Sequence, residues 1–258
     1  MYKTFSAVDY KKHHNLPHDY TVHGFIIVGT FHPGPYAQLK EVLAEFGVKH
    51  ISYGKVNDSP YFAPIIELTI EGKIYWFTIA YGGTILSEWV HLACLFGSQT
   101  NVVIGQCGGL FAEADTPDII VPTYAYANES ITRMYEPNQN HRHNSNEQLN
   151  QKLIKSLSQT HKVWHGPTMT CQAMMAETWE DIQQWSAEGY YGVEMEASTI
   201  FAVSNHFERR SAAVLVIGDN LVKQKTVHDV NYGGGLDARL AVRRDILAAV
   251  LKEVTGKV

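Results

Sequence analysis

Three acidic residues of the sequence stand where a carboxylate could do chemistry: Glu194, Glu196 and Asp219. Glu194 and Glu196 come just before apolar residues at helical spacing. We therefore expect them at the amino end of a helix, where free N–H groups and the helix dipole favour an ionised carboxylate. Asp219 directly follows a run that indicates a buried strand. In an open α/β sheet the carboxyl ends of strands face the ligand crevice, so this acid is placed to act on a bound molecule.

The elements that must position these acids are one helix and one strand. A helix of about three turns is predicted by apolar residues at helical spacing, namely Ala197, Ile200, Phe201 and Phe207. The run 212–217 is continuously apolar and too short for a helix, which predicts a buried parallel strand. Taken singly, each acid would also fit ordinary helix capping or ordinary turn chemistry.

Length and composition bound the class of protein. The 258 residues fit one α/β domain with helices on both faces of a sheet. A balance of 21 basic and 26 acidic residues favours neither nucleic acid nor an anionic membrane as a partner. No apolar run reaches the roughly 20 residues that span a bilayer, and the amino terminus lacks a signal-peptide core, so a cytoplasmic location is expected.

The cysteines and the amino-terminal histidines offer little support for a metal site. Cys94, Cys107 and Cys171 are scattered in or beside apolar runs, so we expect reduced thiols rather than disulfides or a zinc site. Residues 1–24 are polar, and the histidines in them are His13, His14, His18 and His23. No second set of ligands at metal spacing lies nearby, so we expect no metal there. We expect instead an N-terminal arm, residues 1–24, that leans on a single main domain, residues 25–258, or on a neighbouring subunit.

Strands and helices are expected to alternate along that domain. Strands are predicted at 25–28, 48–56, 65–70, 74–80, 102–104, 118–122 and from 163, and helices at 35–46, 84–96, 149–157, 178–187 and 236–254. Gly105 to Gly109 follows a strand, and we expect a glycine-rich turn whose backbone can approach a ligand closely. A plain tight turn would have the same composition. Residues 127–145 are expected to be an exposed loop or lid, and 221–235 a polar loop.

Taken together, Glu-Met-Glu-Ala-Ser-Thr, the helix, the buried strand and Gly-Asp-Asn resemble the nucleoside phosphorylase family. The family includes purine nucleoside phosphorylases, uridine phosphorylases and related nucleosidases. Gly105 to Gly109 is similar to the family's segment beside the base and phosphate sites, and Gly166 to Glu177 is similar to its base-pocket segment. The resemblance implies an α/β, three-layer fold with a mixed central sheet flanked by helices, and a catalytic domain over residues 25–258.

The chemistry that the resemblance implies is cleavage of the bond between a ribosyl anomeric carbon and a purine nitrogen. Positive charge builds on the sugar and negative charge on the leaving base. By resemblance, Glu196 holds the ribose hydroxyls and stays charged, while Met195 packs against the sugar. Asp219 matches the acid that faces the purine N7, and burial should raise its pKa. Further expected substrate-binding residues are Glu194, Met174, Gln106, Cys107 and Gly108.

The phosphate site of phosphorolytic members is where the sequence departs from the family. Those members carry a Gly-Asp-Pro motif with a nearby arginine after strand one, and a second arginine before the glycine turn. Here strand one ends in Gly29-Thr30-Phe31-His32, and Val103 stands at the second arginine position. Gln106 stands where a phosphate-binding serine would be. Neither valine nor glutamine replaces a bidentate guanidinium, although Lys55 or an arginine of residues 133–142 could substitute.

Water is the alternative nucleophile. The turn from Gly105 and the Glu-Met-Glu segment also look like AMP nucleosidases. The glutamate with which methylthioadenosine hydrolases activate water is absent after strand one. His32 could act as the base, because the intrinsic pKa of histidine lies near neutrality. Met174 stands where purine phosphorylases often carry a stacking aromatic residue, which predicts relaxed base selectivity.

We therefore expect an enzyme that cleaves the N-glycosidic bond of a purine nucleoside or nucleotide and releases the free base. We slightly prefer hydrolysis as the reaction. The alternative is phosphorolysis, which would make the chain a purine or uridine nucleoside phosphorylase. A non-catalytic nucleoside-binding sensor is the alternative from another class. No metal or cofactor is expected besides phosphate as a possible co-substrate, and no nucleic-acid or membrane partner. The resemblance implies a homo-oligomer, dimer or hexamer, in which an N-terminal histidine could reach a neighbouring site.

Overall fold

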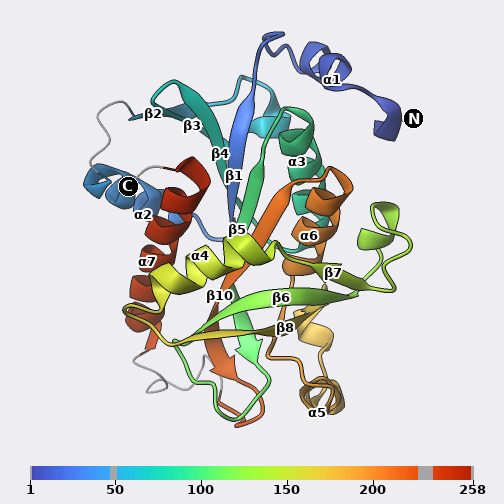
Figure 1. The fold of residues 1–258 in the computed structure, drawn as a ribbon, viewed down its shortest axis with the longest axis vertical. Helices are drawn as coiled ribbons and strands as arrows, with labels where there is room; N and C mark the ends of the chain where they lie inside the picture. The colour runs from blue at the N-terminus through green and yellow to red at the C-terminus, as the bar shows by residue number, and fades with distance from the viewer. Residues whose placement is uncertain (1, 47–50, 226–234, 257–258) are drawn as a thin grey trace.

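The computed structural model describes residues 2–46, 51–225 and 235–256, which form a mixed sheet flanked by helices (Figure 1). The strands are β1 Val22–Gly29, β2 Ile51–Lys55, β3 Ile66–Ile70, β4 Lys73–Ala80, β5 Thr100–Gly109, β6 Ile119–Asn128, β7 Arg142–Asn144, β8 Val163–Cys171, β9 Gly192–Glu194 and β10 Arg210–Asn220. The helices are α1 Ala7–His13, α2 Gly34–Glu45, α3 Gly83–Leu95, α4 Glu147–Leu157, α5 Trp179–Ala187, α6 Ala197–His206 and α7 Gly235–Thr255. Short 3-10 helices are η1 Tyr2–Thr4, η2 Pro60–Phe62, η3 Thr132–Met134 and η4 Met174–Ala176.

The sheet has a closed part and an open part. Its strand order is β10-β6-β8-β9-β5-β1-β4-β3-β2, with β7 beside β6. Because β10 also pairs with β5, the strands β5, β9, β8, β6 and β10 close into a ring, from which β1, β4, β3 and β2 extend. β1 lies parallel to β4 and β5, and β10 lies parallel to β5. The carboxyl ends of these four strands therefore meet at one edge of the sheet.

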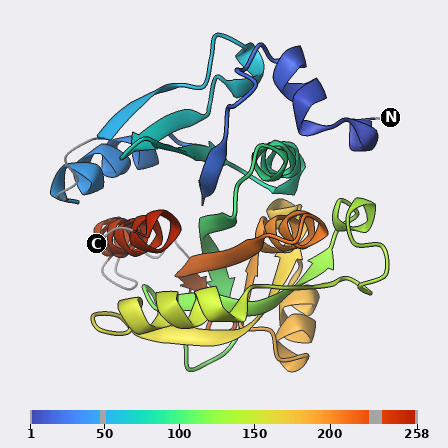
Figure 2. The same cartoon turned by 45° about the horizontal axis from the view of Figure 1, so that its top comes forward.

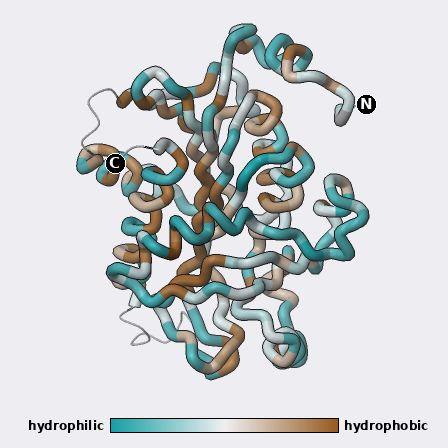
Figure 3. Tube along the Cα trace, in the orientation of Figure 1, coloured by the Kyte–Doolittle hydropathy of each residue, from teal (hydrophilic) through white to brown (hydrophobic). Residues whose placement is uncertain are grey.

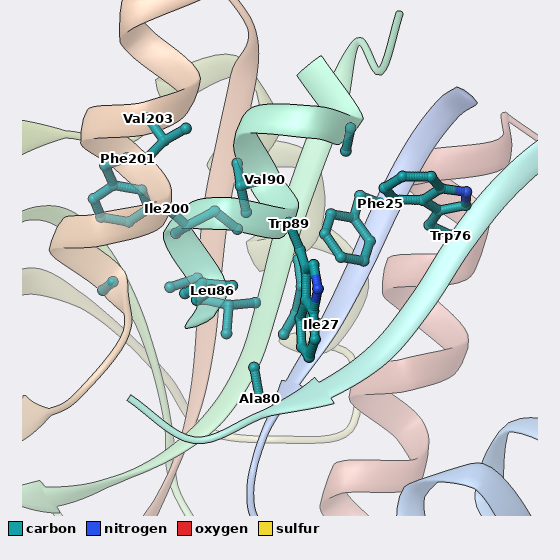
Figure 4. Packing of buried hydrophobic residues seen from close by; sticks show 14 of the residues in the cluster. Phe25, Ile27, Trp76, Ala80, Leu86, Trp89, Val90, Ile200, Phe201 and Val203 are labelled. Carbon is teal, nitrogen blue, oxygen red and sulfur yellow. The ribbon is translucent and has the colours of Figure 1, made fainter. Parts of the chain in front are cut away.

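Helices cover both faces of this sheet. One core cluster packs α3 and α6 against the face that carries Phe25, Ile27 and Trp76 (Figure 4). A second cluster packs α2, α4 and α7 against the opposite face, which carries Ile26 and Val28. Figure 2 shows the two groups of helices on either side of the strands, and Figure 3 shows hydrophobic segments concentrated in the central strands. The expected three-layer α/β fold is confirmed.

Local capping explains where several helices begin. Thr178 and Asp181 form a reciprocal capping box at the start of α5, and Asn146 accepts a hydrogen bond from the Leu149 N–H at the start of α4. Pro35 stands in the first turn of α2, where its missing N–H costs nothing. These helices, together with α3, α6 and α7, lie where the sequence predicts them to within a few residues.

The segment expected as an N-terminal arm is joined closely to the main domain. β1 begins at Val22, and Leu16 and Tyr20 are buried in the core cluster of α3 and α6. The Tyr20 hydroxyl donates to Glu67 Oε2 at 2.6 Å and accepts from Trp76 Nε1 at 2.8 Å. This pair of bonds ties the chain before β1 to β3 and β4.

Two predicted loops are wrong. Gly105 to Gly109 is the last part of β5 rather than a turn, because β10 pairs with it on one side and β9 pairs with its last two residues on the other. Residues 127–145 are not all exposed, because they include the end of β6, η3 and β7, and bury Thr132 and His143. Residues 48–50 of the predicted strand 48–56 and residues 226–234 of the predicted polar loop lie outside the described residues.

Within 2–46, 51–225 and 235–256, no helix is long and apolar enough to cross a membrane. The same ranges contain no group of three or more His, Cys, Asp or Glu side chains placed to hold a metal ion. Cys94, Cys107 and Cys171 are free and buried.

The hydrogen bonds of Tyr20 give a stability prediction. Tyr20→Phe should lower the free energy of unfolding by about 1–3 kcal/mol, because the buried Trp76 N–H loses its acceptor. Urea denaturation measures the loss. Tyr53→Phe is the matched control, since this ring is 54% exposed on the edge strand β2 and its change should stay within about 0.5 kcal/mol. Equal effects of both substitutions would contradict the proposed anchoring of the N-terminal segment.

Candidate active site

The candidate site lies at the edge where β1, β4, β5 and β10 end, and Glu196 is one of two buried glutamates there. Glu196 is 4% exposed and occupies the residue directly before α6. β9 brings it there, because β9 runs antiparallel to β5, with Gly192 opposite Gly109 and Val193 opposite Gly108. The chain after β9 therefore returns along β5. Figure 1 shows how α6 then leaves this edge along one face of the sheet.

Bare backbone surrounds the Glu196 carboxylate. A Cβ atom at Gly29, the last residue of β1, would lie 2.8 Å from Glu196 Oε2. A Cβ at Gly105 of β5 would lie 3.9 Å from the same oxygen. Only glycine at position 29 leaves room for the acid without displacement. The expectation that Gly29 belongs to the site is therefore supported by this close approach.

The loop between β4 and α3 supplies a hydrogen-bond donor. The Gly82 N–H donates to Glu196 Oε1 at 2.7 Å. Gly82 has φ of 77°, a left-handed conformation that glycine adopts without strain. The Met195 methyl lies 3.9 Å from the position of a Cβ at Gly82, so Met195 borders the same space as Glu196.

Glu194 has a positioning role. Its Oε2 accepts from the backbone N–H groups of Glu196 at 2.7 Å and Ala197 at 2.6 Å. Its Oε1 accepts from the Thr170 hydroxyl of β8. Both oxygens are thus engaged at the start of α6, where free N–H groups need acceptors. Glu194, whose expected substrate contact stays a prediction, accepts the backbone hydrogen bonds that fix the chain at Glu196.

The ionisation expected for these two glutamates is corrected by their burial. Desolvation raises the pKa of Glu194 to about 7, although its three donors favour the charged form. Desolvation, and then repulsion from Glu194, raises the pKa of Glu196 to about 8. The sequence argument from the helix terminus predicted two charged acids. Burial outweighs that effect because water is excluded from both carboxyl groups.

Asp219 lies on the other side of β5. It belongs to β10 rather than following it, and it pairs with Gly108 after a register shift that begins at Ile217. A Cβ at Gly108 would lie 3.2 Å from Asp219 Oδ1 and would overlap Leu221. Val193 pairs with Gly108 from the opposite side, so Asp219 and the strand leading to Glu196 are two strand spacings apart, about 10 Å.

The side chains of the neighbouring residues Cys107 and Gln106 lie on opposite faces of the sheet. Cys107 is buried in the core cluster of α3 and α6, and desolvation, then Asp219 and Glu194, raise the pKa of its thiol well above the usual value. A neutral buried thiol is a packing residue, so the expected substrate contact is not supported for Cys107. The Gln106 amide lies against Gly218 of β10, where a Cβ would be 2.2 Å from Gln106 Nε2.

The structure also shows where three other predicted site residues lie, namely His32, Met174 and Lys55. His32 is exposed, and its Nδ1 accepts from the Gly34 N–H at 3.2 Å at the start of α2. Met174 is 49% exposed in η4. Lys55 ends the edge strand β2 and shares a row with Ile66 of β3 and Phe77 of β4. Three strand spacings, about 14 Å, separate Lys55 on β2 from β1, so the structure does not bring Lys55 to the site.

Gln172 is a site residue that the sequence analysis did not single out. Its Nε2 donates to the Met195 carbonyl at 2.8 Å, and its Oε1 accepts from the Gly83 N–H at 2.9 Å. One amide thus joins the end of β8 to the start of α3 and to the residue before Glu196. A glutamine after a strand has no distinctive sequence pattern, so only the folded chain reveals this role.

A cavity of about 480 Å³ opens beside Gln172 and is also lined by Thr84, Glu177 and Trp185. Small-molecule sites commonly have volumes of roughly 300–1,000 Å³. Burial, then repulsion from Asp219 and Asp181, raises the pKa of Glu177 to about 7. Glu177 closes the segment that resembles a base pocket, and it is the third glutamate with a raised pKa, after Glu194 and Glu196.

Comparison with known proteins agrees with this architecture. The model of the phosphorylase superfamily matches residues 86–251, well over half of the chain. The matched region contains β5, Gln172, Glu196 and Asp219.

Two individual proteins are similar to this chain. Guanosine phosphorylase of Halorubrum lacusprofundi is 26% identical over 126 residues, which are 49% of this chain and 52% of that protein. The chain thus matches about half the length of this curated relative. A crystal structure of a protein assigned as a methylthioadenosine nucleosidase, from Weissella paramesenteroides ATCC 33313, has a TM-score of 0.67 and 17% identity. That match covers 91% of this chain and 100% of the other, and shows the same fold.

The raised pKa of Glu196 predicts a pH dependence of stability. Between the unfolded value of 4.5 and about 8, the folded chain binds the extra proton, so the free energy of unfolding should fall as pH rises. The expected slope is on the order of 1 kcal/mol per pH unit. Urea denaturation from pH 5.5 to 8 should show that Glu196→Gln flattens this slope.

Glu113→Gln is the control for that titration, because Glu113 is exposed on the surface. The control should keep the slope of the unsubstituted chain. A Glu196→Gln variant with an unchanged slope would show that the Glu196 carboxyl titrates at an ordinary pKa.

Proposed function

The chain belongs to the phosphorylase superfamily, and from this premise we propose that it cleaves the N-glycosidic bond of a purine nucleoside or nucleotide. The products are the free base and a ribose or ribose phosphate. Two similarities support the choice of a purine: one relative is named for guanosine and the other for methylthioadenosine. The proposal concerns this chain, whose match to the curated relative spans about half of that protein.

The observation that carries the proposal is the placement of Glu196. Its carboxyl group is buried against Gly29 and Gly105 and accepts a hydrogen bond from the Gly82 N–H, at the edge of the sheet where the strands end. As the glycosidic bond breaks, the sugar gains positive charge. An ionised Glu196 in a site of low dielectric stabilises that charge, and ribose hydroxyls that donate to it favour its ionised form.

Asp219 supplies the second function on the other side of β5. The leaving base gains negative charge, which a hydrogen bond or proton from a carboxyl group offsets. Asp219 lies against Gly108 of β5, beside the Leu221 side chain. Met195 is proposed to contact the sugar, and Gln172 to fix the Met195 backbone.

The nucleophile is water or phosphate. Water is favoured because Val103 and the residues after Gly29 offer no guanidinium at the two positions where phosphorolytic members carry one. His32 is the proposed base, since its Nδ1 accepts the Gly34 N–H and its exposed ring follows Gly29.

Assembly and location complete the proposal. We propose a homo-oligomer, because large apolar side chains stand exposed near the site, among them Phe31 at 78%, Met134 at 71% and Met175 at 93%. Three free, buried cysteines are consistent with the reducing conditions of the cytoplasm.

The test is an assay of released base from adenosine, inosine, guanosine and AMP, each with and without phosphate. Base released without phosphate indicates hydrolysis, and base released only with phosphate indicates phosphorolysis. Glu196→Gln and Asp219→Asn should each lower kcat/KM by about 100-fold or more, because each removes stabilisation of developing charge.

Lys55→Gln is the control, since Lys55 lies on the edge strand β2 and should keep full activity. Tight nucleoside binding without any turnover would indicate a sensor. Full activity of both acid variants would overturn the roles given to Glu196 and Asp219.

A further inference from the structure

The side of α7 that faces the sheet changes from apolar to cationic toward the start of the helix. Residues at three- and four-residue spacing form this stripe, namely Arg239, Val242, Arg243, Ile246, Val250 and Val254. The later members belong to the core cluster of α2, α4 and α7. Arg239 and Arg243 continue the same stripe and are only 8% and 7% exposed.

These two guanidinium groups lack compensation within the described residues. The Nε atoms of Arg239 and Arg243 are buried without a hydrogen-bond partner, and none of the ion pairs found in the described ranges involves either residue. Burial, and then the charge of Arg239, lower the pKa of Arg243. Arginine is rarely buried unless it is paired, because the loss of hydration is costly. An anion would offset both the desolvation and the mutual repulsion.

The direction of α7 places these arginines at the candidate site's edge of the sheet. Near the end of α7, Val254 lies against Gly24 at the start of β1, where it would meet a Cβ at 2.4 Å. From Val254 back to Arg243 a helix rises by about 16 Å, which is close to the roughly 16 Å that β1 covers from Gly24 to Gly29. Arg243 is thus level with the carboxyl end of β1, and Arg239 lies one turn beyond.

Contacts with α2 agree with that placement. Gln38 Nε2 donates to the Leu240 carbonyl at 3.1 Å. Gln38 lies in the second turn of α2, which begins shortly after β1 ends. The first turns of α7 are therefore beside the first turns of α2, at the carboxyl edge of the sheet. Figure 1 shows α2 and α7 next to each other.

The strands present polar groups to this face at the same edge. On β5, Val102 and Ile104 pack in the α7 cluster, and Gln106 is the next residue on that face. On β1, Ile26 and Val28 pack there, and Thr30 follows them as a buried hydroxyl residue. At this edge the strands therefore carry an amide, Gln106, and a hydroxyl, Thr30, in place of apolar side chains. They do so at the level where α7 carries arginines in place of its own apolar side chains.

We propose that Arg239 and Arg243, with Gln106 and Thr30 at the facing strand ends, bind a phosphate dianion. Guanidinium groups bind phosphate as forked, permanently charged donors. The inference rests on the proposed function, in which such a group is either free phosphate or the 5′-phosphate of a nucleotide. α7 would then supply guanidinium groups to a chain that lacks arginine at the two positions, Val103 and the residues after Gly29, where phosphorolytic members carry one.

Calorimetric titration of the whole chain with inorganic phosphate, AMP and adenosine tests this site. Arg239→Gln and Arg243→Gln should each weaken phosphate or AMP binding by about tenfold or more, since each removes a charge-assisted pair. Arg244→Gln is the matched control on the same helix, because Arg244 is 34% exposed and pairs with Glu45. The Arg244→Gln variant should bind phosphate or AMP with an affinity within about twofold of that of the unsubstituted chain, because an exposed, paired charge contributes little to a buried site. Arg243→Lys keeps a charge while removing the fork, and covers the case in which the glutamine variant does not fold.

The two sources of phosphate give different results. Binding of inorganic phosphate assigns the site to the co-substrate, and binding of AMP but neither phosphate nor adenosine assigns it to the nucleotide. The inference fails if neither phosphate nor AMP binds, or if the Arg239 and Arg243 variants bind like the Arg244 control. Base release by a chain that binds neither inorganic phosphate nor AMP would overturn this site alone, whereas phosphate or AMP binding without base release would overturn the proposed function alone.

Discussion

The structure depends on the burial of one carboxyl group, Glu196, against backbone at the edge of a sheet. A buried carboxylate loses hydration worth several kcal/mol, which protein donors must replace. The Gly82 N–H is one such donor, but Glu194 stands close enough to oppose the charge. Burial and the neighbouring Glu194 therefore raise the pKa of Glu196 and favour its protonated form. A ligand that brings hydroxyl donors or positive charge can replace this proton, so the charge of the acid is coupled to occupancy of the site.

Glycines beside the acids, and other side chains that cap α6, make this burial possible. Gly29 and Gly105 leave space for the carboxyl group, and Gly108 leaves space for Asp219. Glu194 accepts the N–H groups of Glu196 and Ala197, and the Thr170 hydroxyl accepts that of Ser198, so the start of α6 does not need the Glu196 side chain as its cap. The two glutamates thus differ in their hydrogen bonds, because Glu194 accepts three from the protein and Glu196 accepts one from the Gly82 N–H.

Much of this arrangement could be predicted from the sequence, because apolar periodicity fixes which segments are helices and strands. The helix after Glu196 and the buried strand carrying Asp219 follow from Ile200 and the run 212–217. The strand character of Gly105 to Gly109 could not be predicted, since pairing with β9 and β10 overrides the low strand preference of glycine. The protonation of Glu196 and the burial of Arg239 depend on long-range packing, which local patterns do not contain.

The most direct test of this account is the pKa of Glu196 itself, measured by carbon NMR titration of glutamate labelled at the carboxyl carbon. Spectra of Glu196→Gln identify the resonance. The account predicts a midpoint near pH 8 that falls in Glu194→Gln, because the opposing charge is then removed. A midpoint close to the ordinary value of 4.5 would contradict it, since Glu196 would then be a solvated carboxylate with no proton to exchange for a ligand.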